Sequence, residues 1–196
     1  MSRGKFIVLY GINNLGKTTQ AKLIVEKLAQ NGVNAEYLKY PVYEIKPSGP
    51  LLNNYLREGN THNLSAREVQ IIYVLNKTQF EKTLEAKLDA GINIIAEDYV
   101  GTGLAWGIGT GVDETFLKEQ NSHLLKEDLA FLFDGERFLS AKEKNHRFET
   151  NDDLTQKVRE VHRRLGEEFG WLNIDANLDI NAINDKLYEE IINVIK

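Results

Sequence analysis

The stretch Gly11-Ile12-Asn13-Asn14-Leu15-Gly16-Lys17-Thr18 decides the fold, because its spacing is G-x-x-x-x-G-K-T. An apolar run from Phe6 to Tyr10 precedes it, and a segment with helical periodicity from Lys17 to Asn31 follows it. The two glycines let the backbone curl so that its N–H groups point inward, and the positive end of the helix adds to them. Strand, tight loop and helix in this order predict a loop that binds a polyphosphate.

Side chains within this loop have expected roles in binding the phosphates. We expect Lys17 to reach the β- and γ-phosphates of a nucleotide and the Thr18 hydroxyl to bind Mg²⁺. The loop residues predicted to bind the nucleotide are Gly11, Asn14, Leu15, Gly16, Lys17, Thr18 and Thr19. Because phosphate loops occur in kinases, hydrolases and nucleotide switches, the loop alone leaves these three functions open.

The composition predicts a single domain, residues 1–196, in a reducing compartment. The chain has no cysteine, which excludes disulfides and cysteine-based metal sites. Its net charge of −5 argues against a nucleic-acid surface, and its four histidines lack the spacing of a zinc site. Residues 1–5 lead directly into the first apolar run, and no run has the length that a membrane span needs. We therefore expect a cytoplasmic protein without a membrane or nucleic-acid partner.

Apolar runs alternate with segments of helical periodicity along the chain. Strands are predicted at 5–10, 33–40, 92–96, 129–133 and 171–174. Helices are predicted at 17–31, 51–58, 65–90, 114–120, 154–169 and 180–195, the third starting with the capping box Ser65-Ala-Arg-Glu68. The glycine-rich segment 101–111 is expected to be a loop, packed around Trp106. This alternation predicts an α/β P-loop NTPase fold, a five-stranded parallel doubly wound sheet flanked by helices.

Ligands of such sheets collect at the carboxyl ends of the strands. Those ends carry the phosphate loop, Tyr40-Pro41, Glu97-Asp98-Tyr99, Asp134 and Asp175. A substrate-sized insert at 41–90 favours a small kinase over a hydrolase. The absence of a clear second ATPase motif points the same way, Phe133-Asp134 being the nearest match.

A short lid is predicted at 136–150, after the fourth strand. This segment is basic in its middle and contains Lys142, Lys144, His146 and Arg147. A lid needs a permanent cation to neutralise charge on the transferring phosphoryl group and to exclude water. Arg147 suits that role better than a lysine, because a guanidinium stays charged and binds phosphate through two hydrogen bonds.

Over nearly its full length the chain resembles the thymidylate kinases, as a divergent member. The phosphate loop continues into Thr18-Thr19-Gln20, and Tyr40-Pro41 follows the second strand. The matching segments further on are Gly49-Pro-Leu-Leu-Asn-Asn-Tyr-Leu56, Tyr73-Val-Leu-Asn-Lys77, Glu97-Asp98-Tyr99 to Trp106, Leu125 to Leu129, and His146-Arg147-Phe-Glu149. The resemblance implies the reaction ATP + dTMP → ADP + dTDP in dTTP biosynthesis, with Mg²⁺ as cofactor. It also implies a homodimer packed through long helices such as 66–90.

The resemblance also implies site residues. Lys17, Arg147 and Glu97 would be catalytic, and Thr18 and Glu97 would hold Mg²⁺, partly through water. Tyr73 would stack on the acceptor base, Lys77 would replace an arginine that touches it, and Thr102 and Trp106 would line the nucleoside pocket. Asn13 takes the place of a carboxylate that contacts the sugar hydroxyl. The acceptor-binding set is completed by Pro41, Tyr43 and Asp98, and the ATP-binding set by Arg147 and Asn177, the latter near the adenine.

Three departures from the family pattern leave the acceptor open. Asp98 stands where the family has an arginine, Val42-Tyr43-Glu44 lacks another, and Lys77 replaces a third. The basic role could have moved to Lys39, Lys46 or Arg57. Alternatively, the acceptor is a neutral deoxynucleoside such as thymidine, or the chain is an ATP-binding regulatory protein whose acceptor activity was lost or redirected.

Overall fold

The computed structural model describes residues 2–138 and 151–196 and contains one five-stranded sheet. Its strands are β1 (Phe6–Tyr10), β2 (Ala35–Lys39), β3 (Asn93–Glu97), β4 (Leu129–Asp134) and β5 (Leu172–Asp175). They lie in the order β2-β3-β1-β4-β5, and every pairing is parallel. The predicted parallel doubly wound sheet is therefore confirmed.

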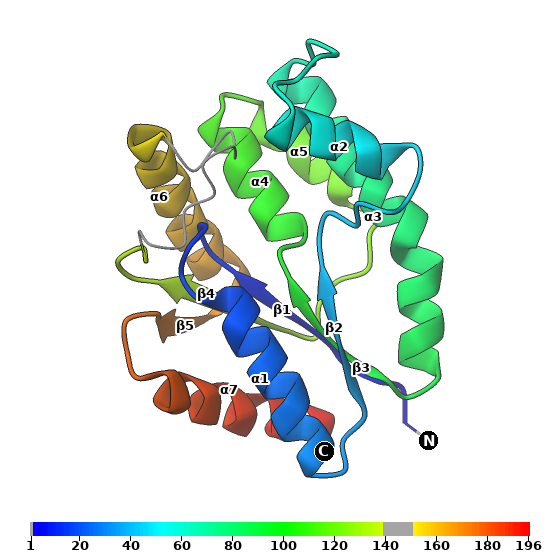
Figure 1. The fold of residues 1–196 in the computed structure, drawn as a ribbon, viewed down its shortest axis with the longest axis vertical. Coiled ribbons are helices and arrows are strands. Elements are labelled where there is room, and N and C mark those ends of the chain that lie inside the picture. The colour runs from blue at the N-terminus through cyan, green and yellow to red at the C-terminus, as the bar shows by residue number, and fades with distance from the viewer. Residues whose placement is uncertain (1, 139–150) are drawn as a thin grey trace.

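Helices cover both faces of this sheet (Figure 1). Within the described residues they are α1 (Lys17–Gln30), α2 (Ser48–Arg57), α3 (Ala66–Asp89), α4 (Val100–Gly109), α5 (Glu114–Asn121), α6 (Asp152–Phe169) and α7 (Ile180–Ile195). Helix α1 packs against α7, whereas α4 packs against α3, α5 and α6. The chain runs from β1 out to β2 and then back across the sheet through β3, β4 and β5, so right-handed crossovers place α1 on one face and α3, α4 and α6 on the other. Helix α7 follows the last strand and joins α1 by packing against it.

The core lies around the central strands. All residues of β1 and β3 are buried, as the continuous apolar runs of a sheet covered on both faces require. A second, smaller cluster of Leu52, Tyr55, Leu56 and Val69 joins α2 to α3. Within the insert at 41–90, helix α2 is thus anchored to the long helix α3 by apolar contacts.

The prediction that the glycine-rich segment 101–111 is a loop is wrong, because most of this segment belongs to helix α4. A Cβ atom added to Gly101 would lie 2.4 Å from the Trp171 ring, and one added to Gly107 would lie 2.7 Å from Leu117. These glycines therefore serve close packing rather than chain flexibility. Helix α2 also begins earlier than expected, at Ser48. The capping box of α3 is confirmed, because Ser65 and Glu68 exchange both hydrogen bonds.

The strand register brings the chemically important residues to one edge of the sheet. Leu9 and Lys39 are both in register with Glu97, and Asp134 is in register with Asp175. The phosphate loop therefore follows β1 at the edge where Glu97 ends β3 and Asp98 follows it. No helix of the described segments is long and apolar enough to cross a membrane.

Candidate functional site

A cavity of about 340 Å³ opens at this edge, between the phosphate loop and the helices α2, α3 and α4. Most of the site residues predicted from the sequence line it: Asn13, Asn14, Leu15, Gly16, Lys17, Thr18, Thr19, Pro41, Tyr43, Tyr73, Lys77, Glu97, Asp98, Thr102 and Trp106. Gly11 and Asn177 do not line it, and Arg147 lies outside the described residues. The structure thus gathers fifteen of the eighteen predicted positions around one space.

The phosphate loop has the backbone that its glycines predict. Gly11, Asn14 and Gly16 have φ angles of 132°, 65° and 80°, and a Cβ at Gly11 would lie 2.4 Å from the Phe133 carbonyl oxygen. The Lys17 ammonium is buried, donates to the carbonyl oxygens of Gly11 and Ile12, and lies 3.8 Å from the Asp98 carboxylate. The loop therefore encloses its own lysine at the position where bound phosphates would meet it.

Glu97 is the centre of a hydrogen-bond cluster beside the loop. Its Oε2 accepts from the Thr18 hydroxyl at 2.6 Å and from the Tyr37 hydroxyl at 2.7 Å, and its Oε1 lies 3.0 Å from Lys39 Nζ. Burial raises the pKa of Glu97, but Lys17, Lys39 and these hydrogen bonds outweigh burial and lower it. Glu97 is thus a buried carboxylate in contact with the hydroxyl that the sequence assigns to Mg²⁺.

These oxygens fit a magnesium ion that arrives with a nucleotide. Mg²⁺ prefers hydroxyl, carboxylate and phosphate oxygens and keeps several waters, so one or two protein groups suffice. Within residues 2–138 and 151–196, no three histidine or acidic side chains cluster to hold a metal by themselves. Phosphate oxygens would have to supply part of the coordination shell.

Asp98 lines the cavity at the position where the family pattern has an arginine. Its φ angle is 62°, its Oδ1 accepts from the Thr102 hydroxyl at 2.9 Å, and its side chain is 17 % exposed. Burial raises the pKa of Asp98, Glu97 adds to that effect, and Lys17 and Lys39 oppose it. Asp98 therefore adds a carboxyl group beside the phosphate loop.

The far side of the cavity is built by one face of α3 against α4. Gln70, Tyr73 and Lys77 are spaced three and four residues apart, so they share that face, opposite Thr102 and Trp106. Lys77 is 3 % exposed, its Nζ lies 3.4 Å from the Tyr73 carbonyl oxygen, and burial lowers its pKa to about 7. This half of the cavity combines an aromatic ring, an amide and an amine, which suits a nucleobase.

Sequence reasoning missed several residues that line the cavity. They are Leu56, Gln70, Asn76 and Gly103. Tyr40 and Tyr99 were placed at the ligand-binding edge without a role, and Lys39 and Arg57 were weighed only as replacements for missing arginines. The spacing of Gln70 to Tyr73 was the available signal, because it places the amide on the face of the expected base-stacking ring. Asn76 instead braces the insert, since its side chain donates to Val42 O and accepts from Val42 N, both at 2.8 Å.

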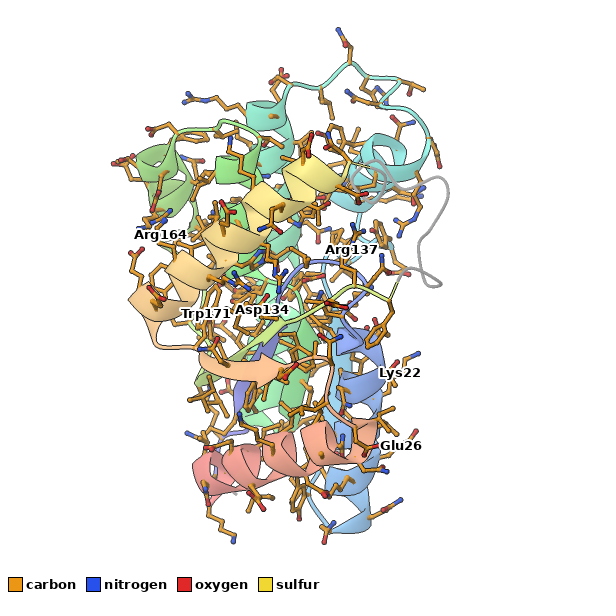
Figure 2. The ribbon with its side chains drawn as sticks, turned by 90° about the vertical axis from the view of Figure 1, so that its left-hand side faces the viewer. Lys22, Glu26, Asp134, Arg137, Arg164 and Trp171 are labelled. Atoms are coloured by element: carbon orange, nitrogen blue, oxygen red, sulfur yellow. The ribbon has the colours of Figure 1, made fainter. Side chains whose placement is uncertain are left out.

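Asp134, at the end of β4, lies on the side where α6 crosses the molecule (Figure 2), and Asn177 holds the segment that follows it. The Asn177 side chain accepts from Glu136 N at 2.6 Å and donates to Glu136 O at 3.0 Å. Asp134 accepts from Arg159 at 2.5 Å and from Arg163 at 2.8 Å, and these contacts outweigh burial and lower its pKa. Asp134, the nearest match to a second ATPase motif, is therefore engaged by α6.

The buried Lys77 makes stability depend on pH. In the folded chain its pKa is about 7, whereas an unfolded lysine titrates near ~10.4. The unfolded state thus binds more protons between these values, so the contribution of Lys77 to stability is lowest at or below pH 7 and rises up to about pH 10. We predict that Lys77→Met raises the free energy of unfolding by about 1–4 kcal/mol at pH 7, and that this gain shrinks towards pH 10. Denaturant titrations at both pH values measure it, with Lys82→Met, at an exposed position of α3, as the control. Equal increases in the free energy of unfolding for Lys77→Met and Lys82→Met would contradict the lowered pKa assigned to Lys77.

Comparisons with known proteins agree with this geometry. The family model described as thymidylate kinase matches residues 9–187. The thymidylate kinase of Plasmodium falciparum (isolate 3D7) is 26% identical over 192 residues, which cover 96% of this chain and 90% of that protein. The solved thymidylate kinase of Candida albicans superposes with a TM-score of 0.82 at 21% identity, covering 100% of this chain and 95% of that one. With the phosphate loop, the parallel sheet and the match over most of its length, this chain belongs to the thymidylate kinase family.

Proposed function

We propose that the protein transfers the γ-phosphoryl group of ATP to dTMP, giving ADP and dTDP for dTTP synthesis. The observation that carries this proposal is the charge of the cavity. Its lining contains the cations Lys17, Lys39 and Arg57, the amine of Lys77, and the carboxylic acids Glu97 and Asp98. An excess of basic groups suits a site that brings together a triphosphate and a monophosphate. Membership of the thymidylate kinase family supports the same reaction.

Catalysis would rest on positioning and electrostatics. The loop N–H groups and Lys17 would hold the phosphates of ATP, and Thr18 and Glu97 would hold Mg²⁺, partly through water. The metal would neutralise charge on the transferring group. Asn13 would contact the sugar hydroxyl of the acceptor, and Tyr73, Lys77, Thr102 and Trp106 would enclose its base. Arg147 would be the cation of the lid, and Asn177 would lie near the adenine. The lid at about 136–150 and a single kinase domain over 1–196 belong to it as well.

A deoxynucleoside kinase is the second candidate function, because Asp98 lines the cavity where a phosphate-binding arginine was expected. A neutral acceptor would not be repelled by this carboxylate, and Glu97 or Asp98 would then act as base towards its hydroxyl. The excess of cations in the cavity favours the charged acceptor, so we place dTMP first.

An ATP-Mg²⁺ coupled assay with dTMP and thymidine side by side separates the two. We predict turnover of dTMP, with thymidine used at least ~100-fold less efficiently in kcat/KM. Lys17→Ala should lower kcat by about 100-fold or more, because it removes a charge that stabilises the transition state. Turnover of thymidine alone would support the second function, and inertness towards every nucleotide acceptor would contradict both.

We further propose a homodimer that packs through α3. Ile71 and Leu75 are 44% and 39% exposed, although both are large and apolar, and they lie one turn apart on that helix. Two such helices could bury these side chains against their symmetry copies. We propose the cytoplasm as the protein's location.

The dimer is tested by sedimentation of wild type and of Ile71→Lys/Leu75→Lys. We expect a dimer for wild type and a monomer for the double variant, since two buried ammonium groups cost far more than the lost apolar contact. The matched control is Phe169→Lys, which changes an exposed aromatic side chain far from α3 in sequence and should stay dimeric. A monomeric wild type at micromolar concentration would refute the interface.

A further inference from the structure

A second cavity, of about 590 Å³, lies across helix α4 from the cavity beside the phosphate loop. Val100, Gly101 and Leu104 of α4 line the second cavity, whereas Thr102 and Trp106, on the opposite face of the helix, line the first. The end of α5, the segment that joins α5 to β4, and the turn between α6 and β5 complete the second cavity. One helix therefore forms a wall of both cavities.

The wall of the second cavity is mostly apolar and partly aromatic. Leu104, Leu124 and Trp171 are buried in it, and Trp171 lies at the turn between α6 and β5 (Figure 2). The ring of Phe169 lies 5.9 Å from that of Trp171 and is 47% exposed. An exposed ring beside an apolar cavity suits a ligand that has an apolar body of its own.

Two polar groups on this wall lack a matching partner. The Glu127 side chain is half-buried, and its Oε1 accepts from the Tyr10 hydroxyl at 2.9 Å, but it makes no ion pair with any described residue. Asn121 donates to the Leu117 carbonyl oxygen, whereas its own Oδ1 is buried without a hydrogen-bond partner within residues 2–138 and 151–196. A carboxylate taken partly out of water favours a cation beside it.

The other charged groups on the wall do not supply that cation. Lys118 pairs with Glu168 at 2.6 Å, and Asp128 accepts from the first backbone N–H of β1 at 2.8 Å. Lys126 is exposed and lowers the pKa of Glu127, but burial outweighs this effect and raises that pKa. The Glu127 carboxylate is therefore the charge that a ligand in this cavity would meet.

Two residues of the second cavity also contact the strand that leads into the phosphate loop. Tyr10 ends β1 directly before Gly11, the first residue of the loop. Its hydroxyl donates to Glu127, and its ring stacks on Trp171 with the ring centres 4.1 Å apart. A ligand that contacts Glu127 would thus act on the residue from which the phosphate loop starts.

We propose that the second cavity is a regulatory site for a small primary amine with an aromatic body. The ammonium group would bind the Glu127 carboxylate, and the body would cover Phe169 and Leu104. Because an ionised carboxylate is the stronger acceptor, a cation that keeps Glu127 ionised strengthens its hydrogen bond with Tyr10. A loop held more firmly at its start loses less freedom when ATP binds, so the amine should tighten ATP binding.

The binding test is NMR titration of the ¹⁵N-labelled protein with phenethylamine and with 2-phenylethanol, a neutral analogue of similar size. The chain has two tryptophans, so the indole signal of Trp171 is the one that persists in Trp106→Phe. We expect phenethylamine to shift this signal and the alcohol to bind at least ~10-fold more weakly, because it lacks the charge. Glu127→Gln, which keeps an acceptor for Tyr10, should weaken the amine about 10-fold. Glu119→Gln, at an exposed position of α5 outside the cavity, should leave the affinity unchanged.

The regulatory part is tested by calorimetric titration of ATP-Mg²⁺ with and without saturating phenethylamine. We expect about fivefold tighter ATP binding with the amine, and by linkage the same factor for the amine with ATP. Tyr10→Phe should still bind the amine and should lose this coupling. An unchanged Trp171 signal, equal affinities for amine and alcohol, or wild-type amine affinity in Glu127→Gln would overturn the site. Unchanged or weaker ATP binding would overturn its regulatory role, whichever acceptor the enzyme uses.

Discussion

The rest of the site depends on the hydrogen bonds that the buried carboxylate of Glu97 accepts. It joins three segments, because it ends β3, accepts from Thr18 at the start of α1 and accepts from Tyr37 and Lys39 on β2. A charged group taken out of water must be matched by partners, or the folded state loses several kcal/mol. The hydrogen bonds that stabilise Glu97 therefore also fix the loop, the second strand and the nearby cations.

This coupling explains why the charged groups of the cavity are paired with one another. Lys17 is enclosed by its own loop and faces Asp98, Lys39 faces Glu97, and Asp98 is oriented by Thr102. Each charge close to the phosphate loop thus has a counterpart before any ligand binds. A bound phosphate would replace these internal partners. Its affinity is therefore the difference in free energy between the unliganded site, in which the charged groups pair with one another, and the liganded site, in which they pair with the phosphate.

The fold could be predicted from local patterns, except where glycine was read without its surroundings. The strands were readable because parallel strands buried on both faces are continuous apolar runs, as in Phe6–Tyr10. Helix α4 was missed because five glycines in eleven residues indicate a loop, while the Trp171 ring that packs on Gly101 lies far away in the sequence. Lys17 was predicted from the spacing of the phosphate loop, and Tyr73 and Trp106 from segments that resemble the family; all three line the cavity.

The remaining cavity residues could not be found in this way. From the sequence Lys39, Lys46 and Arg57 are equivalent cations, and only the docking of α2 on α3 decides which of them faces the cavity. Gln70 is likewise an ordinary helical residue until α4 packs opposite it. Which residues line a cavity between helices depends on which faces of those helices pack together. That packing is determined by residues throughout the chain.

The most direct test of the role given to Glu97 is calorimetric titration of ATP into wild type, Glu97→Gln and Tyr37→Phe, each with and without Mg²⁺. If Glu97 organises the metal side of the phosphate loop, Mg²⁺ should tighten ATP binding to wild type and to Tyr37→Phe. In Glu97→Gln it should have little effect. An equal response to Mg²⁺ in wild type and Glu97→Gln would contradict the account and leave Glu97 with a purely structural role.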